Sequence, residues 1–207
     1  MKKIARFGIG GPVGAGKTAL IEALVPRLVE LGKYPLVVTN DIVTTYDAEH
    51  VRANLVGVLD PNRIVGIETG TCPHTAVRED PTVNLLAIEE LFIKFPDSDL
   101  VLLESGGDNL TLTFSSALVD KTIFVLDVAG GEKTPSKQGL GVIKADLLVI
   151  NKIDLAPFVG ADLNIMARDS DRVRNGRQVI FTNCQTGQGI EVVIDFICSN
   201  LIDDDKN

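Results

Sequence analysis

The sequence predicts a single α/β domain with a mostly parallel central sheet and helices on both faces. Short continuous apolar runs, typical of strands that are covered on both sides, recur along the chain. Several of these runs are separated by stretches whose apolar residues have the spacing of one helix face. The length of 207 residues suits one domain with a full core. We expect residues 1–202 to form this domain and residues 203–207 to be an acidic tail.

The first predicted strand covers residues 4–9, and a helix follows it. Pro26 lies inside this helix pattern, so we expect a kink there or an earlier helix end. A later helix is predicted to begin with Asp80 as its N-cap and Pro81 as its first residue, and Pro96 should stop it. Apolar residues predict further strands at 36–39, 63–67, 100–103, 122–126, 147–150 and 179–181, and a last helix over Ile190, Val193, Ile194 and Ile197.

Composition excludes some functions. The chain has 20 basic and 28 acidic residues, a net charge of −8, which predicts no nucleic-acid partner. It has no apolar run long enough to span a membrane and no secretory signal, so we expect no membrane association. The three cysteines form no C-x-x-C pair and are odd in number, which favours a reduced, cytoplasmic protein.

The strongest motif lies between the first strand and the first helix. It matches G-x-x-x-x-G-K-[ST], the loop that binds nucleotide phosphates with backbone N–H groups at a helix N-terminus. The lysine can reach the terminal phosphates, and the threonine hydroxyl can ligate Mg²⁺. A phosphate-loop NTPase is therefore predicted. The residues are Gly11, Pro12, Val13, Gly14, Ala15, Gly16, Lys17 and Thr18.

A second motif, N-K-x-D, follows the predicted strand 147–150 and indicates which base is bound. The Asp154 carboxylate can accept from both donors on one edge of guanine, and adenine lacks that pair of donors. Asn151 can contact the other side of the base, and the Lys152 stem can lie along its face. Thr182 and Asn183, after the last strand, are expected to close a loop over the base. GTP and GDP are the predicted ligands.

A third feature pairs a cysteine with a histidine, Cys72 and His74. Thiolate and imidazole suit borderline and soft transition metals, and two chains related by a two-fold axis would supply four ligands. Such a set suits tetrahedral Zn²⁺ or planar Ni²⁺. An incidental pairing without a metal remains the alternative. His50, beside acidic residues, is interpreted as a surface histidine.

Six segments occur in a fixed order along the chain: residues 11–18, 39–42, 68–76, 78–80, 104–110 and 151–154. Together they resemble the UreG family, the urease accessory GTPases that help to deliver nickel. The resemblance extends from about residue 4 to about residue 198, nearly the whole chain. In one segment the chain departs from it. After Asn40-Asp41-Ile42 this sequence has Val43-Thr44-Thr45-Tyr46-Asp47, where the family usually has a Lys-Glu-Asp sequence, and Tyr46 cannot replace the glutamate.

The resemblance implies a homodimer that forms on GTP binding and holds Ni²⁺ between the protomers on Cys72 and His74. It implies that Thr18, Asp41 and Glu68 take part in Mg²⁺ binding, with Lys17, Asp41 and Glu104 in the catalytic machinery. It also implies partners, namely the other urease accessory proteins and the urease apoprotein, and release of the metal when GTP is hydrolysed.

Two alternatives to this function are a hydrogenase-maturation type of nickel GTPase and a small-molecule kinase. A kinase usually has an arginine-rich lid, which Arg168, Arg172, Arg174 and Arg177 could imitate. We interpret that cluster as a solvated face instead. Because no arginine finger is evident beside the phosphate loop, hydrolysis by the isolated protein should be slow.

Overall fold

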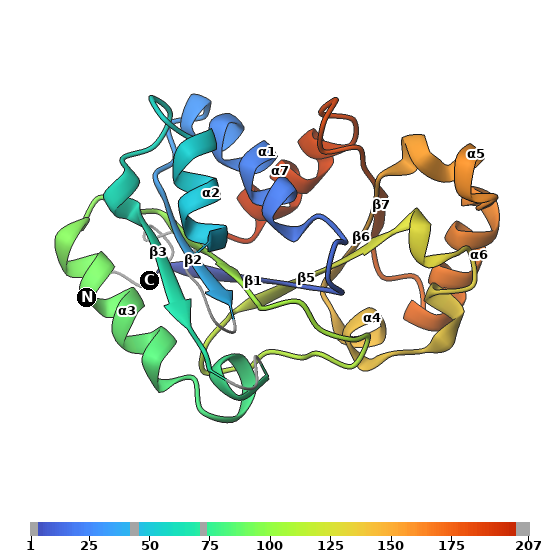
Figure 1. Ribbon diagram of the computed structural model, residues 1–207, viewed down its shortest axis with the longest axis horizontal. Helices are drawn as coiled ribbons and strands as arrows, with labels where there is room; N and C mark the ends of the chain where they lie inside the picture. The colour runs from blue at the N-terminus through green and yellow to red at the C-terminus, as the bar shows by residue number, and fades with distance from the viewer. Residues whose placement is uncertain (1–3, 42–45, 71–73, 202–207) are drawn as a thin grey trace.

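The computed structural model describes residues 4–41, 46–70 and 74–201. Its centre is a seven-stranded sheet in the order β3-β2-β4-β1-β5-β6-β7, and every strand pair in it is parallel (Figure 1). The predicted α/β class with a parallel sheet is therefore confirmed. No helix in the described ranges is long and apolar enough to cross a bilayer.

All seven predicted strands are present, and their ends lie within two residues of the predicted ones. The strands are β1 (Ala5–Gly10), β2 (Pro35–Asp41), β3 (Ile64–Glu68), β4 (Leu100–Glu104), β5 (Lys121–Asp127), β6 (Leu147–Asn151) and β7 (Val179–Phe181). The α-helices are α1 (Lys17–Glu30), α2 (Tyr46–Asn54), α3 (Thr82–Lys94), α4 (Leu140–Lys144), α5 (Ala156–Val159), α6 (Leu163–Arg174) and α7 (Ile190–Ser199). The shorter elements are the 3-10 turns η1 (Pro61–Arg63), η3 (Val128–Gly130), η4 (Pro135–Lys137) and η5 (Ile153–Leu155), and the π-helical segment η2 (Thr75–Glu79).

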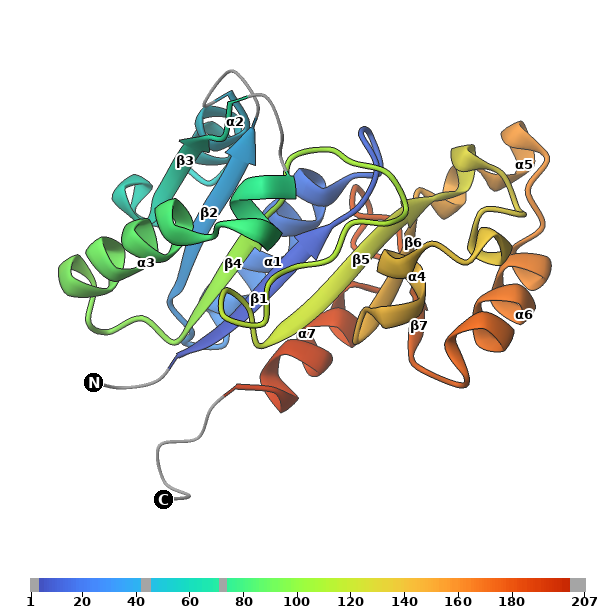
Figure 2. The ribbon, with the colours of Figure 1, turned by 90° about the horizontal axis from the view of Figure 1, so that it is seen from below.

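Two apolar cores lie on opposite faces of the sheet. In β4, Leu102 packs on the face that α1, α2 and α7 cover, and Val101 and Leu103 pack on the face that α3, α4 and α6 cover (Figures 1 and 2). Strands β5 and β6 alternate in the same way. This double burial explains why the strands read as continuous apolar runs rather than alternating ones.

Two helix boundaries differ from expectation. Helix α1 continues through Pro26 to Glu30, so an earlier end at the proline is wrong; Val25 and Leu28 are buried beside it, and their burial favours the helix despite the missing N–H. Pro81 is the N-cap of α3 rather than its first residue. The Asp80 carboxylate accepts from the backbone N–H of Thr82 at 3.2 Å and from its hydroxyl at 2.6 Å. Asp80 therefore satisfies a donor at the start of the helix, but the helix itself begins at Thr82, one residue later than predicted.

The parallel sheet brings the carboxyl ends of all strands to one edge. Gly10, Asp41, Glu104 and Asn151 end the strands β1, β2, β4 and β6 there, although they are far apart in sequence. Strand β1 lies between β4 and β5, so the chain changes direction across the sheet beside it. Ligands of open parallel sheets bind at such a position. The boundary predicted between residues 202 and 203 lies outside the described residues.

Candidate functional site

The loop between β1 and α1 is shaped by glycines. Gly16 has a φ of 96° and forms the N-terminal cap of α1. A Cβ on it would lie 2.3 Å from the Asn151 side-chain nitrogen, so no other residue fits without moving that side chain. Asn151 in turn donates to the carbonyl of the buried residue Ala15 at 3.2 Å. The two sequence motifs therefore meet at the start of α1, where free backbone N–H groups favour anions.

A cavity of about 580 Å³ opens beside this loop at the carboxyl edge of the sheet. Lys17 lies almost fully buried in its wall, and burial lowers the pKa of its ammonium group. Its Nζ donates to the carbonyl of Pro12 at 3.2 Å, so the lysine curls over the loop. The residues from the predicted sites that line the cavity are Val13, Gly14, Gly16, Lys17, Thr18, Asp41, Glu104 and Lys152.

Glu104, at the end of β4, is the most perturbed acid of the cavity. Its side chain is 1% exposed, and burial raises its pKa to about 7, against the opposing effects of Lys17 and of a hydrogen bond from Thr18. That bond, from the Thr18 hydroxyl to Oε1, is 2.8 Å long. The other oxygen, Oε2, is buried without a hydrogen-bond partner in the described structure. A buried oxygen in this state favours a cation beside it.

Three further carboxylates, Glu22, Asp41 and Asp47, line the same cavity. Burial and the neighbouring Asp41 raise the pKa of Asp47. A triphosphate bound against so many acids needs a divalent cation with it, and carboxylate and hydroxyl oxygens are the ligands that Mg²⁺ prefers. The residues fit that ion. Glu68 pairs with Asp41 in the register of β3 and β2 but is exposed and is not among the residues lining the cavity.

A smaller cavity of about 150 Å³ adjoins the first one, since Gly16 and Lys152 line both. Asp154, predicted to read guanine, lies in its wall with Asn151 and Asn183. Cys184 is also in this wall, and burial raises the pKa of its thiol to about 11. A base beside a phosphate-binding cavity would occupy this space.

The residues of the base cavity hold one another in place. Asn151 Oδ1 accepts from the Thr182 hydroxyl at 3.1 Å and from the Cys184 backbone N–H at 3.3 Å. Asn183 Oδ1 accepts from the backbone N–H groups of Gln185 and Thr186, at 3.0 and 3.3 Å. The structure thus has Thr182 orienting Asn151 and Asn183 shaping its own loop, while Asp154 remains exposed toward the cavity.

Lys152 connects the two motifs. Its backbone has a left-handed φ of 60°, and its Nζ donates to the Gly14 carbonyl at 2.5 Å and to the Asp127 carboxylate at 3.3 Å. The lysine therefore fixes the phosphate loop to the end of β5. Sequence reasoning missed Asp127, although an acid directly after a buried strand is a usable signal.

His74 lies close to the phosphate loop through a residue that sequence reasoning also missed. Its Nε2 is 2.5 Å from Oδ2 of Asp108, and the backbone N–H of Asp108 donates to the Gly11 carbonyl at 3.2 Å. Cys72, the other predicted metal ligand, lies outside the described residues. Among the residues described, no three His, Cys, Asp or Glu side chains are grouped as a metal site.

Tyr46 and His50 lie at the rim of the phosphate cavity. Tyr46 begins α2, and its ring stacks on His50 with centroids 6.2 Å apart. His50 is exposed, as expected for a surface histidine, and its Nε2 lies 3.4 Å from Glu22. Residues 43–45 of the segment that departs from the family lie outside the described residues.

The arginine cluster is only in part a solvated face. Arg168 and Arg172 are exposed and pair with Asp169 on α6. Arg174 is instead 1% exposed, so the expectation of a solvated face is wrong for it. Its guanidinium donates to the Val142, Ala145, Asp146 and Gln178 carbonyls, and the need to satisfy these carbonyls explains its burial.

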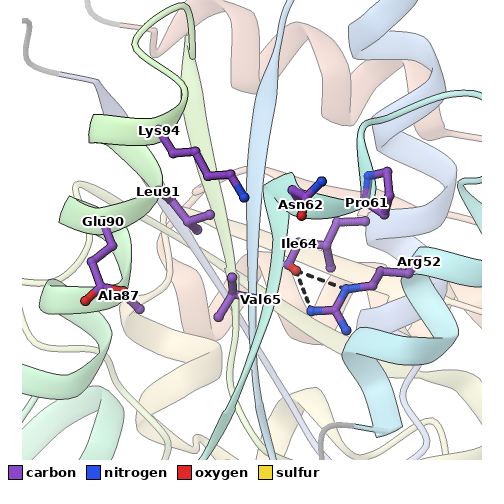
Figure 3. Close-up of a pocket in the computed structure, with 9 residues that line it drawn as sticks. All are labelled: Arg52, Pro61, Asn62, Ile64, Val65, Ala87, Glu90, Leu91 and Lys94. Carbon is purple, nitrogen blue, oxygen red and sulfur yellow. Dashed lines mark hydrogen bonds between the residues drawn. The ribbon is translucent and has the colours of Figure 1, made fainter.

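A third cavity, of about 430 Å³, lies at the edge strand β3 between α2 and α3 (Figure 3). Arg52 points across it and donates to the Ile64 carbonyl at 2.6 and 3.1 Å, which covers an edge carbonyl of the strand. None of the predicted site residues lines it. We assign it no part in nucleotide binding.

Comparison with known proteins agrees with this geometry. Residues 5–181 match the family described as CobW/HypB/UreG, nucleotide-binding domain. The chain is 60% identical over 202 residues to the urease accessory protein UreG of Edwardsiella ictaluri, covering 98% of this chain and 97% of that one. It is 61% identical over 197 residues to the urease accessory protein UreG 2 of Methylorubrum extorquens, covering 95% and 92% of the two chains.

Solved structures give the same fold. The crystal structure of hydrogenase maturation factor HypB from Archaeoglobus fulgidus has a TM-score of 0.72 and 27% identity, covering 95% of this chain and 89% of that one. The urease accessory relatives are more than twice as identical to this chain as HypB is. The matched family gives no support to the alternative of a small-molecule kinase. The chain therefore belongs to the UreG family of urease accessory proteins, which are GTPases of the CobW/HypB/UreG class.

Proposed function

We propose that the protein is a nickel metallochaperone whose metal site is controlled by GTP. In this proposal GTP binding brings two chains together, and Cys72 and His74 of both hold one Ni²⁺ between them. Hydrolysis separates the chains, halves the ligand set and releases the ion. The acceptors are the other urease accessory proteins and the urease apoprotein, and the reduced cytoplasm keeps the Cys72 thiol available.

One observation carries the proposal: His74 lies within one side chain of the phosphate loop. Asp108 contacts the imidazole at 2.5 Å and, through its backbone, the Gly11 carbonyl at 3.2 Å. Gly107, next to Asp108, lines the phosphate cavity. A change at the terminal phosphate can therefore reach the imidazole through a short run of packed residues.

The ligand chemistry supports a shared site. One chain offers a thiolate and an imidazole, and a two-fold axis through the metal doubles this set. Two sulfurs and two nitrogens satisfy planar Ni²⁺, and Zn²⁺ is the competing ion because it accepts the same ligands in tetrahedral geometry. The chain's membership of the UreG family, whose resemblance implied nickel delivery, favours nickel as the cargo.

The nucleotide side of the proposal assigns Mg²⁺ to the acidic cavity. Thr18 and Asp41 would hold it, with Glu68 beside Asp41 on β3, and Glu104 would become ionised near it. Lys17 would neutralise the terminal phosphate, and we assign catalytic parts to Lys17, Asp41 and Glu104. None of the described residues that line the cavity is an arginine, which supports slow hydrolysis by the protein alone.

The test is sedimentation combined with metal analysis, with Ni²⁺ and either a non-hydrolysable GTP analogue or GDP. We expect dimers with one Ni²⁺ per two chains with the analogue, and monomers with little metal with GDP. With the analogue, Cys72→Ala and His74→Ala should each abolish the dimer and its bound Ni²⁺. Cys198→Ala, which removes a thiol on α7, should leave the dimer and its Ni²⁺ unchanged. Nickel bound at one ion per chain, regardless of nucleotide or substitution, would contradict the proposal.

A further inference from the structure

The backbone of Lys152 has an unusual conformation at the start of η5. Its φ of 60° is left-handed, a region in which a residue with a Cβ is strained. The two other non-glycine residues with such a φ among those described, Gln138 and Asn175, follow η4 and α6, and helices often end in this conformation. Lys152 instead precedes a helical turn, so the contacts around it must compensate for the strain.

The ammonium group of Lys152 lies between the phosphate loop and the end of β5. Its Nζ donates to the Gly14 carbonyl at 2.5 Å and to Oδ2 of Asp127 at 3.3 Å. The preceding residue, Asn151, donates to the next carbonyl of the loop, that of Ala15, at 3.2 Å. Two successive loop carbonyls are therefore engaged by side chains at the end of β6. A carbonyl held in this way is kept from turning its partial negative charge toward a bound phosphate.

Each oxygen of the Asp127 carboxylate has its own donor. Oδ1 accepts from the backbone N–H of Gly130 at 2.9 Å and so caps η3, while Oδ2 faces the Lys152 ammonium group. The Asp127 side chain is 15% exposed, and a carboxylate so far buried is costly unless donors meet it. Asp127 lies opposite Asn151 in the register of β5 and β6, so the sheet sets its position beside Lys152.

Asp127 does not itself line the nucleotide cavities. It is not among the described residues that line the phosphate cavity or the base cavity, whereas Lys152 lines both. The turn that Asp127 caps, η3, packs against η5, which carries Asp154. An effect of Asp127 on nucleotide binding therefore has to pass through Lys152 or through η3.

We propose that Asp127 is a positioning residue for nucleotide binding that acts on the phosphate loop through Lys152. The Lys152 side chain is 36% exposed, so water competes for its ammonium group. The fixed carboxylate favours the arrangement in which the lysine reaches the Gly14 carbonyl, and the loop keeps the shape that receives phosphate. This role is one of pre-organisation and requires no movement of the loop. The inference concerns the nucleotide site alone and does not depend on nickel.

The first measurement compares nucleotide binding by Asp127→Asn and wild type. Asparagine keeps an oxygen for the Gly130 N–H and turns an NH₂ group, which cannot accept, toward the lysine. We expect the affinities for GTP and GDP to fall by about fivefold each, because the same loop receives both nucleotides. The hydrolysis rate at saturating GTP should stay within about twofold. Unchanged affinity would overturn the inference, whatever the hydrolysis rate.

Asp146→Asn is the matched control. Like Asp127, Asp146 contacts a lysine with one carboxylate oxygen, Lys121 at 3.2 Å, and accepts a backbone N–H with the other, that of Thr122 at 2.8 Å. It directly precedes β6, at the edge of the sheet opposite to the nucleotide cavities. We expect this variant to bind GTP and GDP as wild type does. An equal loss of affinity in the control would overturn the inference.

A double-mutant cycle with Lys152→Met separates positioning through the lysine from a merely structural role. Methionine keeps much of the apolar stem and removes the ammonium group. In the Lys152→Met background, Asp127→Asn should change GTP affinity by less than about twofold, because both substitutions remove one interaction. Losses that multiply would overturn the inference. If Asp127→Asn does not fold, Lys152→Met with wild-type affinity still overturns it, and a loss of about fivefold or more supports it.

Discussion

The Thr18 hydroxyl, in the first turn of α1, donates to Glu104 Oε1 at 2.8 Å across 86 residues of sequence. The bond joins the end of the phosphate loop to the end of β4, and Lys17 lies beside it. It satisfies one oxygen of a carboxyl group whose other oxygen is buried without a partner in the described structure. Burial at this position raises the pKa of the Glu104 carboxyl group to about 7.

Glu104→Gln should make the nucleotide-free protein less sensitive to pH. The pKa of Glu104 is about 7 when folded and near 4.5 when unfolded, so the folded state binds the proton more tightly. The resulting stability is fully present below about pH 4.5 and is lost as the pH rises through about 7. Between pH 5.5 and 8 the variant should gain about 2 kcal/mol relative to wild type.

Urea unfolding at several pH values measures this difference. Glu89→Gln, at an exposed position of α3, is the control, and its unfolding free energy should follow that of wild type at every pH. A constant difference between Glu104→Gln and wild type across this range would mean that Glu104 is already ionised at low pH.

Asp154→Asn should lose affinity for GTP and gain affinity for xanthosine triphosphate. The Asp154 carboxylate is exposed toward the base cavity and is expected to accept from two guanine donors. Losing two charge-assisted bonds should cost roughly 2–4 kcal/mol, and at least tenfold in affinity. Titration of labelled GTP, ATP and xanthosine triphosphate in Mg²⁺ buffer tests this. Wild type that binds ATP and GTP equally would contradict the guanine assignment.

Lys17→Ala should abolish nucleotide binding and leave the fold intact. Lys17 is buried, and burial lowers its pKa, so its charge costs the folded state energy that removal of the side chain recovers. We expect native-like circular dichroism, an undiminished melting temperature and no measurable hydrolysis. Lys144→Ala, at an exposed position of α4, should hydrolyse GTP at the wild-type rate. Normal hydrolysis by Lys17→Ala would refute the phosphate-loop interpretation.

The strands were predictable because each is buried on both faces and so appears as an unbroken apolar run. Helix α2 was not, because only Ala48 and Val51 of its nine residues are buried and most of the others are polar or charged. Helix α6 has the same difficulty: it buries Asp169, Ser170 and Arg174 along with Met166. Local patterns predict elements whose buried face is apolar and fail where polar groups are buried against tertiary partners.

The same limit applies to the site. The two nucleotide motifs could be recognised because their residues are consecutive and their chemistry needs fixed spacing. The pairs Asn40–Asn84 and His74–Asp108 join residues that are distant in sequence, and nothing local marks them as partners. The raised pKa of Glu104 likewise depends on burial that only the folded chain creates.

Arg174→Ala should destabilise the fold without changing nucleotide specificity. The Arg174 guanidinium is buried and donates to backbone carbonyls at the end of α4 and at the start of β7, so the truncation leaves several of them unsatisfied. We expect a loss of at least about 3 kcal/mol in unfolding free energy. Arg172→Ala is the matched control two positions earlier on α6, and its exposed pairing with Asp169 should be worth less than about 0.5 kcal/mol. Below the melting temperature both variants should bind GTP as wild type does. A stable Arg174→Ala protein that had lost nucleotide binding would instead give Arg174 the role of a lid arginine, as in a kinase.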